Sequence, residues 1–103
     1  MKPEIVPGRV VFSKKGRDKG RYFVVLLSLD ADFVMVSDGD TRKLARMTKK
    51  RRKQLCPQPA EFPAIAADYA AGTAQDAQIR KALAPFKKGA QESSLGRDQS
   101  VQG

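Results

Sequence analysis

Closely spaced cations are the residues of this sequence best suited to a chemical role. Five of the eight residues from Lys14 to Arg21 are lysine or arginine, and Gly16 and Gly20 lie among them. Lysine and arginine bind phosphate groups and displace the counterions around nucleic acid. A glycine with positive φ lets the backbone approach a phosphate without a Cβ in the way. The segment therefore predicts a phosphate-binding loop that carries five cations, Lys14, Lys15, Arg17, Lys19 and Arg21, and in which Asp18 caps the turn.

A second group of cations lies further along the chain. Lysine and arginine occupy all five positions from Lys49 to Lys53, and Arg42, Lys43 and Arg46 precede them. Such a run binds polyanions even when it is unfolded, so a disordered basic tail is the alternative to a folded element. For the loop, the alternative is a solvated hairpin without a ligand.

Aromatic residues next to cations can also contact nucleic acid. Tyr22 follows Arg21 at the exit of the loop and is the best candidate for stacking on a base. Phe12, Phe23 and Phe33 are expected in the core instead. The predicted RNA-binding residues are Lys14, Lys15, Arg17, Lys19, Arg21, Tyr22, Arg42, Lys43, Arg46, Lys49, Lys50, Arg51, Arg52 and Lys53.

The excess positive charge is confined to the first half of the chain. The whole sequence of 103 residues has a formal net charge of +9. Residues 1–56 hold 15 basic and 6 acidic residues, whereas residues 57–103 hold five of each. A domain with such an excess repels itself unless a polyanion neutralises it. Nucleic acid is the expected partner, and an anionic membrane or an acidic protein would be the competing partners.

The composition argues against several other functions. Histidine is absent and Cys56 is the only cysteine, so one chain cannot assemble a zinc site of the usual ligands, and the commonest general base is missing. The aspartates near Gly39 are typical of turns, with Mg²⁺ binding a remote alternative. We expect no catalytic residues, no metal, no cofactor and no small-molecule substrate. A lone cysteine, no apolar run of membrane-spanning length and no signal peptide predict a cytoplasmic protein.

Short runs of β-branched and aromatic residues predict the elements that hold the basic loop. Residues 9–13, 22–27 and 33–36 are strand-like, and residues 42–47 can form a fourth strand with Leu44 facing inward. Tight turns between them argue for a small antiparallel sheet or barrel. The expected core comprises Val11, Val24, Leu26, Val34, Val36 and Leu44, and the glycines expected to shape turns are Gly8, Gly16, Gly20 and Gly39.

The second half of the chain predicts less structure. Three prolines and several alanines indicate a linker over residues 56–72. Thr73 is typical of a helix N-cap, because Asp76 follows three residues later, and Ile79 and Leu83 form a narrow apolar stripe. We therefore expect a short helix over residues 73–87. Residues 88–103 are rich in Gly, Ser and Gln and are expected to be disordered.

The segment from Gly8 to Val25 resembles the KOW motif of ribosomal and transcription-elongation proteins. In that motif a glycine precedes a hydrophobic strand, a basic loop ends in a Lys-Gly pair, and a second strand follows; Lys19-Gly20 matches the pair. Extended over residues 3–55, the pattern is similar to stand-alone bacterial KOW proteins related to a eukaryotic and archaeal large-subunit ribosomal family. The resemblance implies an SH3-like barrel whose loop contacts RNA, with no cofactor and no reaction.

The sequence therefore predicts a mainly β protein: an SH3-like barrel of the KOW type with its basic extension, a linker, a short C-terminal helix and a tail. The expected function is non-enzymatic binding of RNA, ribosomal or ribosome-associated, with ribosomal or transcription proteins as further partners. The alternative is a protein-interaction module of the transcription or translation machinery that uses the barrel and the helix. A membrane role is not expected, because no amphipathic helix combines a basic face with large apolar residues.

Overall fold

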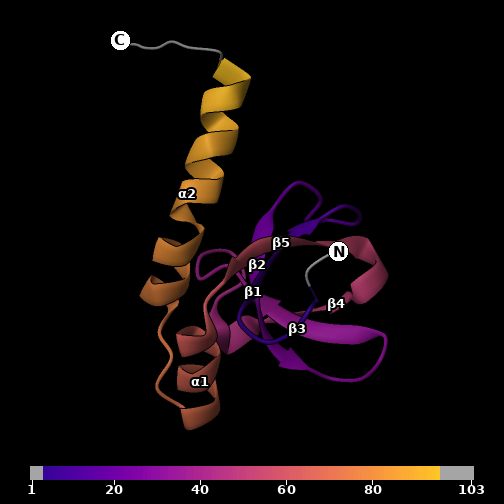
Figure 1. Cartoon of the computed structure of the whole chain (residues 1–103), viewed down its shortest axis with the longest axis vertical. Helices are drawn as coiled ribbons and strands as arrows, with labels where there is room; N and C mark the ends of the chain where they lie inside the picture. The colour runs from indigo at the N-terminus through magenta and orange to yellow at the C-terminus, as the bar shows by residue number, and fades with distance from the viewer. Residues whose placement is uncertain (1–3, 96–103) are drawn as a thin grey trace.

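A single antiparallel sheet forms the centre of the molecule (Figure 1). The computed structural model describes the backbone of residues 4–95 and the side chains of residues 4–87. The strands lie in the order β4-β3-β2-β1-β5, and every pair of neighbours is antiparallel. Their bounds are β1 Arg9–Ser13, β2 Tyr22–Ser28, β3 Phe33–Ser37, β4 Thr48–Arg51 and β5 Leu55–Glu61.

The two strands at the ends of this order, β4 and β5, are joined by the short 3-10 helix η2, Arg52–Gln54. No ladder pairs these two strands within residues 4–95, so the sheet is not closed there. The coarse prediction of a small antiparallel sheet from the first half of the chain is confirmed, with one strand more than expected. The closed barrel stays a prediction.

The predicted linker over residues 56–72 is wrong, because this segment contains β5 and a helix, α1, Pro63–Ala71. Proline lacks an N–H group and is therefore confined to the edges of sheets and the first turns of helices. Pro57 and Pro59 lie in β5, which pairs with β1 alone. Pro63 opens α1 in its first turn. The prolines mark the boundaries of elements here.

The fourth strand also lies elsewhere than predicted. Residues 42–47 form a turn and the 3-10 helix η1, Leu44–Arg46, and the strand follows at β4. Two side chains bind backbone N–H groups that a strand would need for pairing. Asp38 Oδ1 accepts the N–H of Arg42 at 2.7 Å, and Asp76 Oδ1 accepts the N–H of Leu44 at 2.8 Å. Local partners of this kind compete with strand pairing.

The C-terminal helix is longer than predicted: α2 spans Asp76–Leu95 and includes Pro85. Thr73 does not cap it but closes the end of α1, where its N–H donates to Asp68 O. The side chain of Gln78 instead accepts the N–H of Gln75 at 2.7 Å. The backbone of residues 88–95 continues α2, and the predicted disorder of residues 88–103 stays a prediction, of which the part at 96–103 lies outside the described residues.

The core has two parts, one on each face of the sheet. Consecutive residues of a strand point to opposite faces, so Val10 and Val11 are both fully buried but belong to different clusters. The side chains of Val10, Val24 and Leu26 pack against the two helices, which lie together on one side of the sheet (Figure 1). The cluster on the other face contains Val11, Phe23, Val25, Val34, Val36 and Leu55.

Five of the six predicted core residues are buried, and Leu44 is half-buried against the helix cluster. The apolar stripe of α2 is buried as well, because Ile79 and Leu83 are both fully inaccessible. Burial of this stripe explains why a helix that is marginal alone is held in place. Within residues 4–95, no helix combines the length and the apolar character needed to cross a bilayer.

Gly39 provides a test of how closely α2 approaches the sheet. Its φ is +72°, and a Cβ at this position would lie 2.5 Å from the backbone oxygen of Asp76 in α2. We expect Gly39→Ala to lower the free energy of unfolding by roughly 3 kcal/mol, from backbone strain and displacement of the helix. The measurement is urea denaturation followed by circular dichroism.

The matched control is Gly20→Ala, since Gly20 also has a positive φ, +89°, but no atom lies within 4 Å of its Cβ position. This variant should show the backbone strain alone, roughly 1 kcal/mol. Equal losses in the two variants would contradict the close approach of α2.

Candidate nucleic-acid interface

The loop between β1 and β2, residues 14–21, is closed by its own backbone and is called the basic loop below. The N–H of Ser13 donates to Arg21 O at 2.9 Å, and the N–H of Gly20 donates to Ser13 O at 2.8 Å. Gly16 and Gly20 both have positive φ, which is the left-handed conformation that such a turn requires. All five of its cations are exposed to solvent, and only Arg21 among them forms an ion pair within the described residues.

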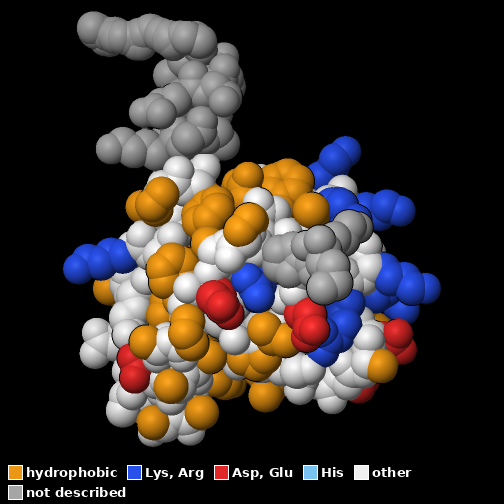
Figure 2. Space-filling model, viewed as in Figure 1, with side chains coloured by type: hydrophobic (Ala, Val, Ile, Leu, Met, Phe, Trp, Pro, Cys, Tyr) orange, Lys and Arg blue, Asp and Glu red, His pale blue; other side chains and the backbone are white. Residues whose placement is uncertain are grey.

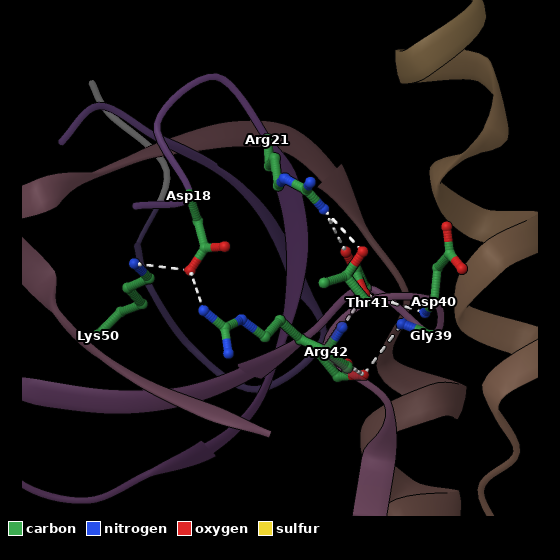
Figure 3. A network of polar contacts seen from close by, with 9 residues as sticks. Asp18, Arg21, Gly39, Asp40, Thr41, Arg42 and Lys50 are labelled. Carbon is green, nitrogen blue, oxygen red and sulfur yellow. Dashed lines mark hydrogen bonds and ion pairs between the residues drawn. The ribbon is translucent and has the colours of Figure 1, made fainter. Parts of the chain in front are cut away.

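Asp18 is the one acidic residue of the basic loop, and its side chain points inward (Figure 3). The residue is only 4% exposed, and its Oδ2 lies 3.1 Å from Lys50 Nζ and 3.2 Å from Arg42 Nη2. Its carboxylate therefore does not cap the turn as predicted but joins the loop to β4 and to the β3–η1 connection. Removing one partner of an ion pair that is mostly shielded from water strongly destabilises the folded protein, because the other charge stays buried without a partner.

Two further contacts hold the basic loop against the same segments. Arg21 donates to Thr41 Oγ1 at 2.9 Å and lies 3.6 Å from the buried carboxylate of Asp38 (Figure 3). The N–H of Lys14 donates to Gln54 O in η2 at 2.8 Å. The tertiary structure thus brings the loop beside both of the later basic segments.

The run Lys49–Lys53 is not a disordered tail, because it forms β4 and the start of η2. Alternation along the strand divides its charges, with Lys50 buried and Lys49 and Arg51 exposed. Arg52 has a structural role. Its guanidinium donates to Ile5 O at 2.6 Å, to Asp30 O at 3.1 Å and to Ser28 Oγ.

The predicted RNA-binding residues therefore fall into two groups. Arg21, Arg42, Lys50 and Arg52 are engaged in contacts inside the protein. The others use their side chains in no hydrogen bond or ion pair within the described part of the chain, and all of them except the half-buried Tyr22 are exposed. The exposed cations around the basic loop, called the basic surface below, are Lys14, Lys15, Arg17, Lys19, Lys43, Arg46 and Lys53.

In the space-filling view, most visible lysine and arginine side chains lie on the half of the molecule built from strands and loops, away from the helices (Figure 2). Charges of one sign gathered on one side raise the local potential there and attract a polyanion from a distance. The surface is suited to binding phosphates by position and charge.

Tyr22 lies in an aromatic cluster at the exit of the basic loop. Its ring centroid is 5.0 Å from that of Phe12 and 5.2 Å from that of Phe86 in α2. The ring is half-buried and contributes to the packing of the helix on the sheet. Its role in base stacking stays a prediction, restricted to the part of the ring that these contacts leave open.

The sequence analysis missed two residues of the site, Asp18 as an anchor and Phe33 as a surface residue. The sequence did contain a signal for Asp18, because it is a single acidic residue among five cations. For the second, the alternation in Phe33-Val34-Met35-Val36 puts Phe33 on the face opposite to the two valines. The valines are fully buried and Phe33 is not, and Lys49 Nζ and Arg51 Cζ each lie 4.8 Å from its ring centroid.

The clustered aspartates act mainly within the turns, as the sequence predicts. Asp30 Oδ1 accepts the N–H groups of Asp32 and Phe33, both at 2.8 Å, and these bonds lower the pKa of Asp30. In the next turn, Asp38 Oδ1 accepts the N–H groups of Asp40 and Arg42. Among the described residues, no group of three or more potential metal ligands comes together.

Comparison with known protein families finds none that matches this chain. Comparison with curated proteins finds no significant relative either. The resemblance to the KOW family therefore stays a prediction, carried by the motif residues alone.

The anchoring role of Asp18 can be tested with Asp18→Asn. The change leaves Lys50, whose side chain is 10% exposed, without its anionic partner. We expect the free energy of unfolding to fall by roughly 3 kcal/mol. Asp40→Asn is the matched control, because Asp40 is exposed and lies in the neighbouring turn (Figure 3). Urea denaturation of both variants checks this, and a loss no larger than that of the control would show that Asp18 is not an anchor.

Acid unfolding gives an independent test of the same contact. Burial alone would raise the pKa of Asp18, but the hydrogen bonds from Lys50 and Arg42 outweigh it and hold the pKa below its ordinary value of 3.8. A carboxylate with a lowered pKa stabilises the fold fully above the unfolded-state pKa, and this stabilisation is lost as the pH falls through the folded-state pKa.

We therefore expect the free energy of unfolding to fall more steeply below about pH 4 in the unmodified protein than in Asp18→Asn. Denaturation curves at a series of acidic pH values measure the two slopes. Parallel slopes would mean that the carboxylate of Asp18 contributes nothing in this pH range.

Proposed function

We propose that the protein binds RNA, without catalysing a reaction, by placing the cations of the basic surface against the phosphate backbone. The observation that carries this proposal is the inward Asp18, which pairs with Arg42 and Lys50 and with none of the loop cations. Four exposed cations of the loop therefore have no acid partner inside the described structure, namely Lys14, Lys15, Arg17 and Lys19. A loop with so many unpaired like charges repels itself, and a polyanion relieves that repulsion.

The basic loop has a defined conformation in the absence of a ligand. Its backbone is closed by the hydrogen bonds between Ser13, Gly20 and Arg21, and its side is fixed by Asp18. A preformed loop loses less conformational freedom on binding than a flexible tail does. Phosphate contacts of this kind supply affinity and position and carry little information on base sequence.

Within this proposal, the sheet is an SH3-like barrel of the KOW type and the RNA is ribosomal or ribosome-associated. The strand order β4-β3-β2-β1-β5 and the 3-10 helix between β4 and β5 support the barrel. The Lys19-Gly20 pair at the end of the basic loop supports the KOW motif. Contacts with ribosomal or transcription proteins belong to the same proposal.

A protein-interaction module remains the alternative, and the structure gives it less support. The alternative needs an apolar stripe on the C-terminal helix that is free for a partner. Ile79 and Leu83 are fully buried against the sheet, so the stripe is already occupied.

Removing two loop charges tests the proposal. We expect Lys15→Gln with Lys19→Gln to weaken binding to a ribosomal RNA hairpin about tenfold or more, since each lost phosphate contact also lowers the slope of log affinity against log salt by about 0.7 to 0.9. Fluorescence anisotropy over a salt series measures both quantities. Co-sedimentation with ribosomal particles, with the same variant alongside, tests the ribosomal partner separately.

The matched control is Lys81→Gln with Lys87→Gln. This pair removes the same charge from exposed positions on α2. It should change affinity only slightly, through the net charge. Equal losses in the two pairs would mean that binding follows net charge and that the basic loop is not the site.

A further inference from the structure

The outer face of β3 and β4 carries a second group of exposed side chains. The two helices pack on this same face of the sheet, but over β1 and β2, where they contact Val10, Val24 and Leu26. Further along the sheet, Phe33 and Met35 are only half-buried, and Leu27 is 40% exposed. A partly apolar surface among charged residues often marks a binding site.

The strand register places these side chains side by side. Leu27 pairs with Met35, and Met35 pairs with Lys49. Phe33 pairs with Arg51, two residues from Met35 and therefore on the same face. An irregularity in the register between Val25 and Leu27 accompanies the exposure of Leu27, while Leu26 stays buried under the helices. The β3–β4 face below means Leu27, Phe33, Met35, Lys49 and Arg51.

Two cations of the β3–β4 face lie over one aromatic ring. Lys49 Nζ and Arg51 Cζ are each 4.8 Å from the ring centroid of Phe33. Neither side chain forms an ion pair within the described residues. The ring attracts both cations through its π-electrons but does not neutralise them. An anion placed at this face would therefore be attracted by both charges.

The turn before β3 holds Phe33 in place. The carboxylate of Asp30 accepts the N–H of Phe33, and the guanidinium of Arg52 binds the backbone oxygen of Asp30. The aromatic ring, with its two cations, is thus presented by a fixed backbone. A preformed surface of this kind loses little entropy when a ligand binds.

We infer that the β3–β4 face binds an unpaired nucleotide of the RNA. The phosphate contacts Lys49 and Arg51, and the base lies against the guanidinium of Arg51 and the apolar side chains of Leu27 and Met35. This inference rests on the proposed RNA binding and adds the kind of RNA that is recognised.

The chemistry of the face favours an unpaired base over the alternatives. A base inside a duplex presents only its edges, whereas an unstacked base presents a flat surface to aromatic, arginine and apolar side chains. A protein interface would also use Phe33, Met35 and Arg51, whose residue types are enriched there. Lysine is depleted in protein interfaces, so Lys49 favours a partner that carries phosphate.

The test uses two RNA probes, a blunt ribosomal RNA hairpin and the same hairpin with a single-stranded uridine extension. The unmodified protein should bind the extended hairpin about tenfold more tightly by fluorescence anisotropy. Phe33→Leu, and separately Lys49→Gln with Arg51→Gln, should remove this gain, and circular dichroism checks that both variants are folded. The loop pair Lys15→Gln with Lys19→Gln should weaken binding to both probes and keep their ratio.

The outcomes separate this inference from the proposed function. If the unmodified protein binds neither probe, RNA binding itself fails and the inference fails with it. If it binds both probes equally, or if the face variants keep the gain, RNA binding stands and the β3–β4 face is not its second contact. Capture of a protein partner that needs the β3–β4 face, with no gain from the extension, would also overturn the inference.

A measurement on the unmodified protein avoids any effect of the variants on folding. Titration with a short oligouridine should shift the methyl NMR signals of Leu27 and Met35, while the methyl signals of Leu83, which is buried between α2 and the sheet, stay in place. Unmoved signals of Leu27 and Met35 at saturating oligouridine would overturn the inference.

Discussion

The arrangement of the basic residues depends on the carboxylate of Asp18. This one group binds Lys50 in β4 and Arg42 in the β3–η1 connection, so it joins three segments that are far apart in the sequence (Figure 3). Lys50 is nearly buried, and a buried ammonium group without an anion would be strongly unfavourable. The pairing therefore fixes where the basic loop lies, and with it the direction in which the remaining loop cations point.

The same contact explains how a strongly cationic domain can be folded. Cations that lie partly beneath the surface are paired with acids or backbone oxygens, as Arg42 is with Asp18 and Arg52 with the backbone oxygen of Ile5. The remaining cations project into water, where a high dielectric constant and salt weaken their repulsion. Most of the excess charge thus lies exposed on one side of the molecule. There it destabilises the fold little and is accessible to a polyanion.

The helices cover one face of the sheet over β1 and β2 but leave it open over β3 and β4. Over β1 and β2 the outer face is closed by α1 and α2, whose residues Ile65, Ile79 and Leu83 complete a core that the strands alone could not bury. Over β3 and β4 the same side carries Phe33 under two cations. The two helices cover only part of this face, and the part left open carries exposed cations.

The sequence by itself determined the strands that begin at Arg9, Tyr22 and Phe33, four of the six fully buried valines and the two glycines of the basic loop, because alternation and turn chemistry involve neighbouring residues. It could not show that the prolines after Cys56 lie in an edge strand, or that Lys50 and Arg42 are paired internally while Lys15 and Lys19 are not. Lysines and arginines look alike along the chain. Only the register of the folded strands decided which of them meets Asp18, because that choice depends on contacts between distant segments.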